Sequence, residues 1–213
     1  MRACHISDCH DVYQDLNVLV PQDIDILFIT GDMTYRGRES EIEFLMLDLV
    51  KLKKRIKYIV CVFGNHEVEC QGREQEYKLK FASIGVTLLN HESVEIEGVR
   101  TFGSPYTPEF FDWAFMYKRE DGEKVWDQIP SGTQVLLTHG PALGILDLCP
   151  NGHVGCEDLK NKILYGLPSL KYHLFGHIHE SYGTMEEKGI FFSNGSIMNG
   201  SYRFINPPIV FEL

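Results

Sequence analysis

Metal-binding side chains gather in five short segments of the sequence. These segments are Asp8-Cys9-His10, Gly31-Asp32, Gly64-Asn65-His66-Glu67, His139 and Gly176-His177-Ile178-His179. Aspartate supplies an anionic oxygen, neutral histidine a nitrogen and asparagine a carbonyl oxygen, and this donor set suits manganese, iron or zinc. Cys9 is expected to point away from Asp8 and His10, because alternate residues near a strand end face opposite sides. The segments therefore predict a metal site without thiolate ligands.

Each segment directly follows a predicted β-strand. Runs of β-branched and aliphatic residues predict strands at Arg2–Ser7, Asp25–Thr30, Lys57–Phe63, Thr133–Thr138 and Lys171–Phe175. Between the second and third of these strands, Ser40–Ile56 repeats apolar residues at the helical period and predicts a helix. Alternating strands and helices indicate a layered α/β domain, in which the loops after the strands converge on one crevice. The candidate ligands are therefore expected to meet there.

The rest of the chain predicts shorter elements. Short strands are predicted at Thr87–Leu89, Ser93–Ile96 and Val99–Gly103, and they are expected to extend a second sheet. Glu97-Gly98 is a hairpin signal between the last two of them. Ser104–Met116 holds two prolines and predicts a long surface loop, and Tyr182–Leu213 predicts a β-meander.

The size and composition of the chain limit its class. Its 213 residues suit a single domain, residues 1–213, with room for a sizeable core. The 44% hydrophobic and 23% charged residues are typical of a soluble protein. No apolar run approaches the roughly 20 residues that span a bilayer, so no membrane association is expected. The first residues lack the apolar stretch of a signal peptide, which predicts a cytoplasmic protein with six reduced cysteines.

The charge of the chain bears on its substrate. A formal net charge of −10 disfavours binding to duplex nucleic acid, since such binding depends on Lys and Arg replacing condensed counterions. A small anionic substrate stays compatible with this charge, because bound divalent cations would reverse the local sign.

In this order, the five segments resemble the signature of the calcineurin-like metallophosphoesterase superfamily. The specific part is Gly64-Asn65-His66-Glu67 with a later Gly176-His177-Ile178-His179, and the whole pattern runs from Asp8 to His179. Further segments, among them the tail Asn206–Phe211, resemble the small metallophosphoesterase-domain-containing proteins. The resemblance implies an α/β fold in which two mixed sheets form a four-layer α-β-β-α sandwich.

The resemblance also implies a binuclear metal centre. It places Asp8, His10 and His179 on one divalent ion, Asn65, His139 and His177 on the other, and Asp32 between both. Manganese is the expected metal, with iron or zinc as alternatives. One shared carboxylate is physically reasonable, because the two ions of such sites lie only about 3.5–4 Å apart. A hydroxide held by the metals would then attack the phosphorus of the ester.

His66 is the expected catalytic residue. By resemblance it faces the substrate, where an imidazole can protonate the leaving oxygen or stabilise the transition state. Glu67 has two possible roles, orienting a histidine or capping the segment that follows. The aromatic stretch Tyr106–Tyr117 is expected to pack in the core in preference to lining the crevice.

Four histidines lie outside the motifs. His5 and His173 are expected to be hydrogen-bonded structural residues on strands, and His91 and His153 are assigned no role.

The predicted activity is that of a phosphodiesterase that cleaves small-molecule or nucleotide-type phosphate esters. One alternative is a protein-binding scaffold without catalysis on the same fold, since a fold does not dictate a function. Another is a nuclease. All ligand positions are filled, which disfavours the scaffold, and no basic surface or cap domain supports the nuclease. The expected partner is therefore a small phosphate ester, and no oligomeric state is predicted.

Overall fold

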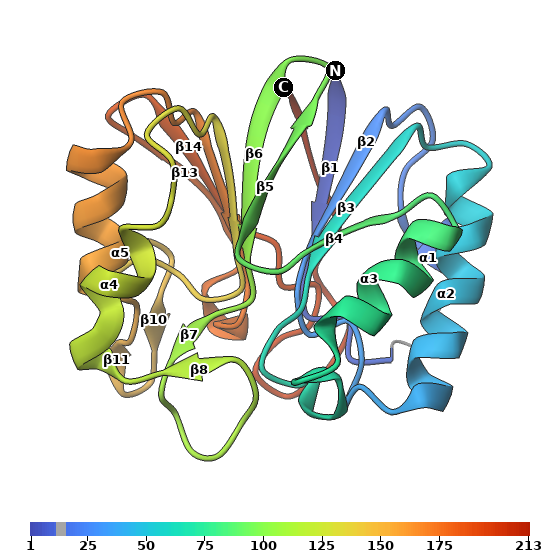
Figure 1. Ribbon diagram of the computed structural model, residues 1–213, viewed down its shortest axis with the longest axis horizontal. Helices are drawn as coiled ribbons and strands as arrows, with labels where there is room; N and C mark the ends of the chain where they lie inside the picture. The colour runs from blue at the N-terminus through green and yellow to red at the C-terminus, as the bar shows by residue number, and fades with distance from the viewer. Residues whose placement is uncertain (12–15) are drawn as a thin grey trace.

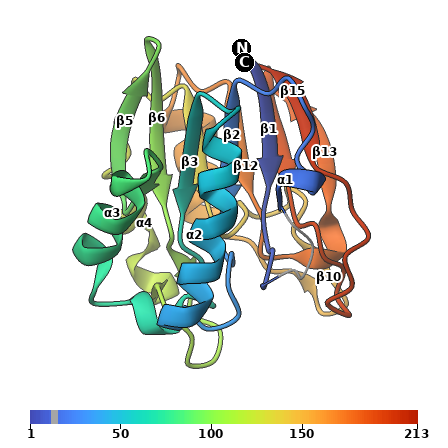
Figure 2. The ribbon, with the colours of Figure 1, turned by 90° about the vertical axis from the view of Figure 1, so that its right-hand side faces the viewer.

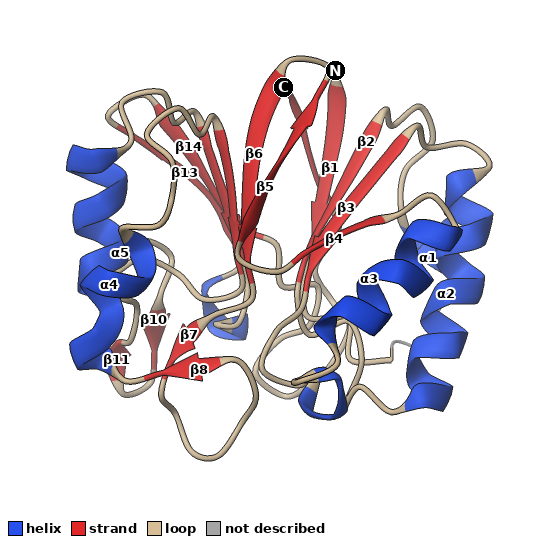
Figure 3. Cartoon of the chain, in the orientation of Figure 1, coloured by secondary structure: helices blue, strands red, loops and turns tan. Residues whose placement is uncertain are grey.

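Two β-sheets pack face to face, with helices on both outer sides, in the computed structural model, which describes residues 1–11 and 16–213 (Figures 1 and 3). The first sheet has the order β15-β1-β2-β3-β4. Its strands are β1 (Arg2–Ile6), β2 (Ile26–Thr30), β3 (Tyr58–Val62), β4 (Thr87–Leu89) and β15 (Ile209–Glu212). Neighbouring strands are parallel except for β15, which runs antiparallel to β1, so the sheet is mixed.

The second sheet has the order β13-β14-β12-β9-β6-β5. Its strands are β5 (Glu92–Ile96), β6 (Val99–Ser104), β9 (Val135–Thr138), β12 (Tyr172–Phe175), β13 (Gly183–Glu187) and β14 (Ile190–Asn194). The four central strands are parallel and the two edge strands antiparallel, so this sheet is mixed too. Two small pairs lie outside it, β7 (Thr107–Pro108) with β8 (Met116–Tyr117) and β10 (Leu148–Cys149) with β11 (Gly152–His153).

Helices cover the outer face of each sheet (Figure 1). The helices are α1 (Leu16–Leu19), α2 (Glu39–Lys53) and α3 (Glu74–Ser83) on the first sheet, and α4 (Gly122–Trp126) and α5 (Glu157–Asn161) on the second. Helix α2 runs along its sheet (Figure 2) and buries Ile42, Leu45, Leu49 and Leu52 against it. This spacing is the helical period that predicts the element from sequence.

Three apolar layers separate the four layers of secondary structure. Strand β2 shows why, because all five of its residues are buried and successive side chains face opposite sides. Ile26 and Phe28 join the core between the sheets, whereas Leu27 and Ile29 join the core beneath the helices of the first sheet. The predicted four-layer sandwich of two mixed sheets is therefore confirmed.

The Glu97-Gly98 hairpin is confirmed too. Ile96 pairs with Val99, and both turn residues have positive φ, 49° for Glu97 and 80° for Gly98. A turn with two residues in the left-handed conformation matches the twist of the two strands.

Three expectations about the elements were wrong in part. The tail is not a meander, because β13 and β14 form a hairpin but β15 crosses to the first sheet and pairs with β1. Strand β4 extends the first sheet and not the second. Within Ser104–Met116, β6 ends at Ser104 and the short strands β7 and β8 flank the loop. Strand pairing between distant segments leaves no local pattern, so sequence periodicity did not reveal these partners.

Two further facts concern the whole described chain. All six cysteines are free, as expected. Among residues 1–11 and 16–213, no helix combines the length and the apolar character needed to cross a membrane.

Candidate metal centre

The predicted site residues gather at one edge of the sandwich, at the carboxyl ends of strands from both sheets. Asp8 and His10 follow β1, Asp32 follows β2, Asn65 and His66 follow β3, His139 follows β9, and His177 and His179 follow β12. In Figure 1 this edge lies at the bottom, opposite the two chain termini. The parallel strands of the two sheets therefore deliver all eight side chains to a single crevice.

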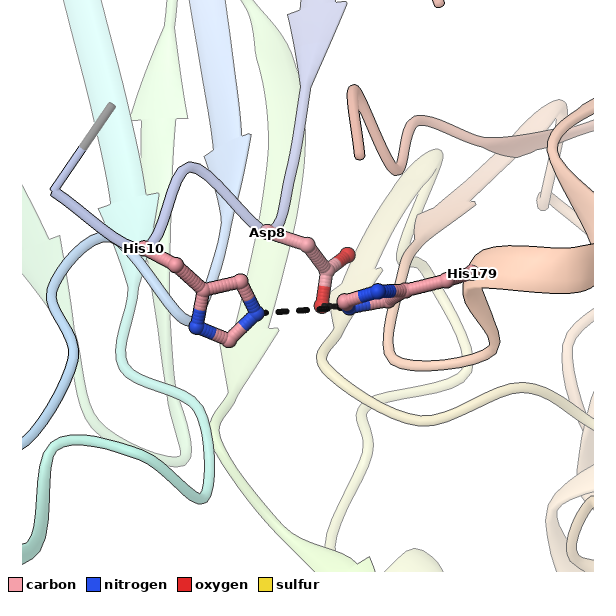
Figure 4. A group of neighbouring side chains, drawn as sticks. All are labelled: Asp8, His10 and His179. Atoms are coloured by element: carbon pink, nitrogen blue, oxygen red, sulfur yellow. Dashed lines mark hydrogen bonds and ion pairs between the residues drawn. The ribbon is translucent and has the colours of Figure 1, made fainter. Parts of the chain in front are cut away.

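The first cluster consists of Asp8, His10 and His179, each with a ligand atom within 4.8 Å of the others. Figure 4 shows the three side chains pointing toward one another. The Nε2 atom of His179 lies 3.3 Å from Asp8 Oδ1 and 3.3 Å from Nε2 of His10. Nδ1 of His179 donates a hydrogen bond to the Asn199 carbonyl at 3.2 Å, which leaves Nε2 as the metal-binding nitrogen.

The second cluster consists of Asp32, His139 and His177, again within 4.8 Å of one another. Nε2 of His139 lies 3.3 Å from Asp32 Oδ1 and 2.9 Å from Asn65 Oδ1, so the asparagine belongs to this side of the site. Nδ1 of His139 donates to the Thr30 carbonyl at 2.8 Å, and Nε2 is again left for a metal.

Asp32 lies between the two clusters. Its Oδ2 is 3.7 Å from Nε2 of His10, while its Oδ1 is 3.3 Å from Nε2 of His139. Asp8 and Asp32 are almost fully buried, and within the described residues neither of them pairs with a lysine or an arginine. Buried carboxylates are ordinarily paired with a cation or coordinate a metal. The donors present therefore fit divalent metal ions.

Electrostatics favour positive charge at this place. Burial opposes ionisation of both aspartates, yet His179 holds the pKa of Asp8 well below its usual range and His139 does the same for Asp32. Burial likewise opposes protonation of the histidines, but Asp32 raises the pKa of His139 to about 9 and Asp8 raises the pKa of His179 to about 9. The carboxylates thus attract cations, and protons take that role when no metal is bound.

Left-handed backbone turns aim four of the candidate ligands. Asp8, His10, Asp32 and His177 have φ values of 54°, 42°, 48° and 69°, a conformation that is uncommon outside glycine and clusters at functional sites. Each follows a strand end, so the turn redirects the side chain from the sheet into the crevice.

The motif glycines allow the turns to approach one another. A Cβ on Gly64 would collide with the Asp32 carboxylate, and a Cβ on Gly176 would collide with the side chains of Ser7 and Asp8. Only glycine fits there without displacing a ligand.

His66 lies beside both clusters and lines the cavity. Its backbone N–H donates to Asp32 Oδ1 at 2.8 Å, and its Nδ1 donates to the Tyr35 carbonyl at 2.9 Å, so Nε2 is the free nitrogen. A third group of ligand atoms within 4.8 Å joins His66 to His10 and Asp32. The position therefore suits contact with a bound phosphate.

Glu67 is fully buried and accepts four hydrogen bonds. Oε2 receives the N–H groups of Asp32 at 3.1 Å and Gly64 at 2.6 Å, while Oε1 receives Thr34 N at 2.9 Å and Thr34 Oγ1 at 3.0 Å. Burial and the Asp32 charge raise its pKa to about 8. These bonds go to backbone N–H groups and to the Thr34 hydroxyl, so Glu67 ties the turn after β2 to the turn after β3.

A cavity of about 590 Å³ opens next to the candidate ligands. Among the residues that line it are Asp32, Asn65, His66, Phe110, Phe111, Trp113, Arg119, His177, His179 and Tyr202. The stretch Tyr106–Tyr117 is therefore divided: Ala114 and Phe115 pack in the core as expected, whereas Trp113 lines the cavity.

Two residues of the tail that lie at the site were not predicted from the sequence. Ser196 donates a hydrogen bond to Asp8 Oδ2 at 2.5 Å, and the ring of Tyr202 lies 5.0 Å from that of His10 and 5.2 Å from that of His179. Neither residue belongs to a ligand motif. The only available signal was the Gly and Asn content of the tail, which indicates turns and not a site.

The histidines outside the motifs are structural or peripheral. His5 is buried and bonds Thr30 and Ser193 at 2.8 Å each, as expected for a structural residue. His173 is buried and bonds Thr138 at 2.8 Å, but its Nδ1 has no partner among the described residues.

The sequence is similar to several known proteins. A family model described as calcineurin-like phosphoesterase matches residues 1–181. Metallophosphoesterase domain-containing protein 1 of Homo sapiens is 34% identical over 214 residues, which cover 89% of this chain and 64% of the human protein. A UPF0046 protein of Caenorhabditis elegans is 33% identical over 225 residues, and this alignment covers 100% of this chain and 75% of the nematode protein. The chain thus spans less than two thirds of the human relative.

Solved structures share the fold at low sequence identity. One described as phosphopantetheinyl hydrolase from Mycobacterium tuberculosis aligns with a TM-score of 0.63 and 16% identity, covering 94% of this chain and 90% of that one. A structure described as an archaeal phosphodiesterase aligns with a TM-score of 0.51 and 13% identity, covering 99% and 100%. These structures show the shared fold alone. The family model over residues 1–181 and the relative from Caenorhabditis elegans that is 33% identical show that the chain belongs to the calcineurin-like phosphoesterase family, a family of metal-dependent phosphoester hydrolases.

Proposed function

We propose that this chain is a binuclear metal-dependent phosphodiesterase that cleaves small-molecule or nucleotide-type phosphate esters. The observation that supports this most directly is the place of Asp32, within 3.7 Å of His10 on one side and 3.3 Å of His139 on the other. A single buried carboxylate between two sets of donors suits two cations that share it. Manganese is the metal we expect, with iron or zinc as alternatives.

The side chains of the site have different roles in the proposed reaction. Two bound cations would supply an activated water and neutralise charge on the phosphoryl oxygens. Asp8 and Asp32 hold the negative charge that keeps these cations in place. His66 has its Nδ1 engaged by Tyr35, so its Nε2 is the nitrogen that can give a proton to the departing oxygen.

The cavity supports a small substrate. Its volume of about 590 Å³ lies in the range of ordinary small-molecule sites. Phe110, Phe111 and Trp113 give one part of the wall an apolar character, while Arg119 is a cationic lining residue. A diester carries one negative charge and two organic groups, which suits a partly apolar wall.

Six free cysteines support a reducing, cytoplasmic compartment.

A substrate panel tests the proposal. The protein is stripped of metal, reconstituted with Mn²⁺ and assayed on alkyl and nitrophenyl mono- and diesters and on a short fluorescent oligonucleotide. We expect metal-dependent cleavage with a preference for the small diesters, and a parallel preparation of Asp32→Asn reveals any contaminating activity. Processive cleavage of the oligonucleotide would indicate a nuclease. No cleavage of any ester by the metal-loaded protein would favour a scaffold.

A further inference from the structure

The indole of Trp113 lies face to face with the imidazole of His66. The ring centroids are 4.3 Å apart and the planes differ by 23°. The ring of His10 meets the same imidazole edge-on at 4.5 Å, and Nδ1 of His66 donates to the Tyr35 carbonyl at 2.9 Å. The hydrogen bond fixes one atom of the imidazole, but the ring could still rotate about that bond. The stacked indole fixes its plane.

The loop that carries Trp113 is anchored to the metal-binding loop. The backbone N–H of Ala114 donates to the carbonyl of Asn65 at 3.1 Å. The ring of Phe115 stacks on that of Phe63, at the end of β3, with centroids 5.8 Å apart and planes 28° from parallel. Ala114 and Phe115 are both buried, so the indole is held at a defined place beside its histidine.

We propose that Trp113 is a positioning residue for His66, an inference that rests on the proposed phosphodiesterase function. By holding the imidazole plane, the indole keeps Nε2 of His66 directed into the cavity, toward the leaving oxygen of the substrate. A misplacement of about 1 Å at a catalytic group can cost on the order of 10²-fold in rate. Losing the stack should therefore reproduce part of the effect of losing His66 itself.

A direct role for Trp113 in binding the substrate is the competing explanation. One face of the indole is covered by the imidazole, so only the other face and the edge remain for a ligand. A substrate-binding indole would act independently of His66, and its loss would raise KM. A positioning indole acts through His66, and its loss lowers kcat.

A double-mutant cycle separates these two roles. Trp113→Leu keeps apolar bulk but removes the planar ring, and Trp113→Phe keeps a ring that can stack. We expect Trp113→Leu to lower kcat by about 10- to 100-fold on an alkyl diester and much less on a nitrophenyl diester. Trp113→Phe should retain most of the rate. In the His66→Ala background, Trp113→Leu should cause no further loss.

A spectroscopic measurement complements the kinetics. The ring current of the indole should shift the His66 ring protons upfield in NMR spectra of the metal-free protein, and these signals are identified by their absence in His66→Ala. In Trp113→Leu they should move downfield. Phe44→Leu is the matched control, since Phe44 is 73% exposed on α2; it should match the wild type in kinetics, metal content and melting temperature.

The outcomes are distinct. Independent, multiplicative losses in the cycle, a pure KM effect or unmoved His66 signals would overturn the positioning role while leaving the phosphodiesterase proposal in place. Absence of turnover in the reconstituted wild type would overturn the proposed function, and the catalytic role of Trp113 with it.

Discussion

Asp32 is the side chain on which the proposed binuclear site depends most. Replacing it with asparagine removes the charge shared between the two clusters while preserving size. We expect Asp32→Asn to lose bound metal and to lose more than about a hundredfold in activity, beyond the usual cost of removing a residue that only supports a ligand. Metal analysis and kinetics on the same sample test this, with Asp112→Asn, an exposed aspartate, as the control. Two tightly bound ions and near-normal turnover in Asp32→Asn would refute the shared role.

Two ligand histidines should make metal binding depend on pH. In the metal-free protein, burial lowers the pKa values of His139 and His179, but the neighbouring aspartates outweigh this effect and raise both pKa values to about 9. At pH 7 both rings hold a proton that a metal must displace. As pH rises toward 9 this competition weakens, so apparent affinity should increase by up to about tenfold per pH unit for each proton displaced.

Calorimetry in buffers of different ionisation enthalpy measures this release, which we expect to approach two protons per chain when both sites fill at pH 7. At a limiting metal concentration, activity should fall together with this affinity as pH drops below about 9. Affinity that does not change between pH 6 and 9 would contradict the ligand roles of these histidines.

His66 should act on the leaving group and not on the metals. A positioned general acid contributes typically about 10²–10⁴-fold, and its contribution is largest when the leaving group is a poor one. We therefore expect His66→Ala to slow a ribose-type diester by that factor and a nitrophenyl diester much less, with both metals retained. Equal losses on the two esters would point to stabilisation of the phosphoryl oxygens, and loss of metal would make His66 a ligand.

The residues of the candidate centre were predictable because Asp, His and Asn are the side-chain types that bind metal ions. Asp, His and Asn after strand ends form a chemical pattern in the sequence, and the structure brings all eight side chains together. Ser196 and Tyr202 were not predictable in this way. They reach the centre only because the tail folds back over it, and serine and tyrosine are too common in loops to suggest a site by type alone.

At the scale of elements, Glu67 connects the turns after β2 and β3. Removing its carboxylate in Glu67→Ala leaves buried N–H groups unpaired, at a cost of about 1–3 kcal/mol for each group. We expect lower thermal stability and a metal affinity reduced by about 10- to 100-fold, since the turn that carries Asp32 loses its support. Glu69→Ala is the matched control, because that side chain is 52% exposed. Unchanged metal affinity in Glu67→Ala would show that the turns hold their shape without it.

The elements themselves were predictable where a strong period exists. The five strands that precede ligands and helix α2 (Glu39–Lys53) lie where the sequence places them, within a few residues at each end. Helix α3 (Glu74–Ser83) was not predicted. It buries only Tyr77 and Phe81, so its sequence carries little helical periodicity.

At the scale of the whole molecule, long-range pairing completes the sandwich. Strand β15, near the C-terminus, pairs with β1, and the N-terminal ammonium donates to the carbonyl of Leu213 at 3.0 Å. Both chain ends thus lie together at the edge opposite the metal centre (Figure 1). The four-layer architecture followed from the family resemblance, whereas the pairing of β15 with β1 could not be inferred from local sequence patterns.

A titration of metal-stripped protein with Mn²⁺ tests whether two ions that share Asp32 drive phosphodiester hydrolysis. Bound metal and the rate on an alkyl diester are followed in parallel as ions are added. We expect two ions per chain, a rate that rises until the second site fills, and complete loss of activity on chelation. Full activity in the stripped protein, or saturation of the rate at a single bound ion, would contradict it.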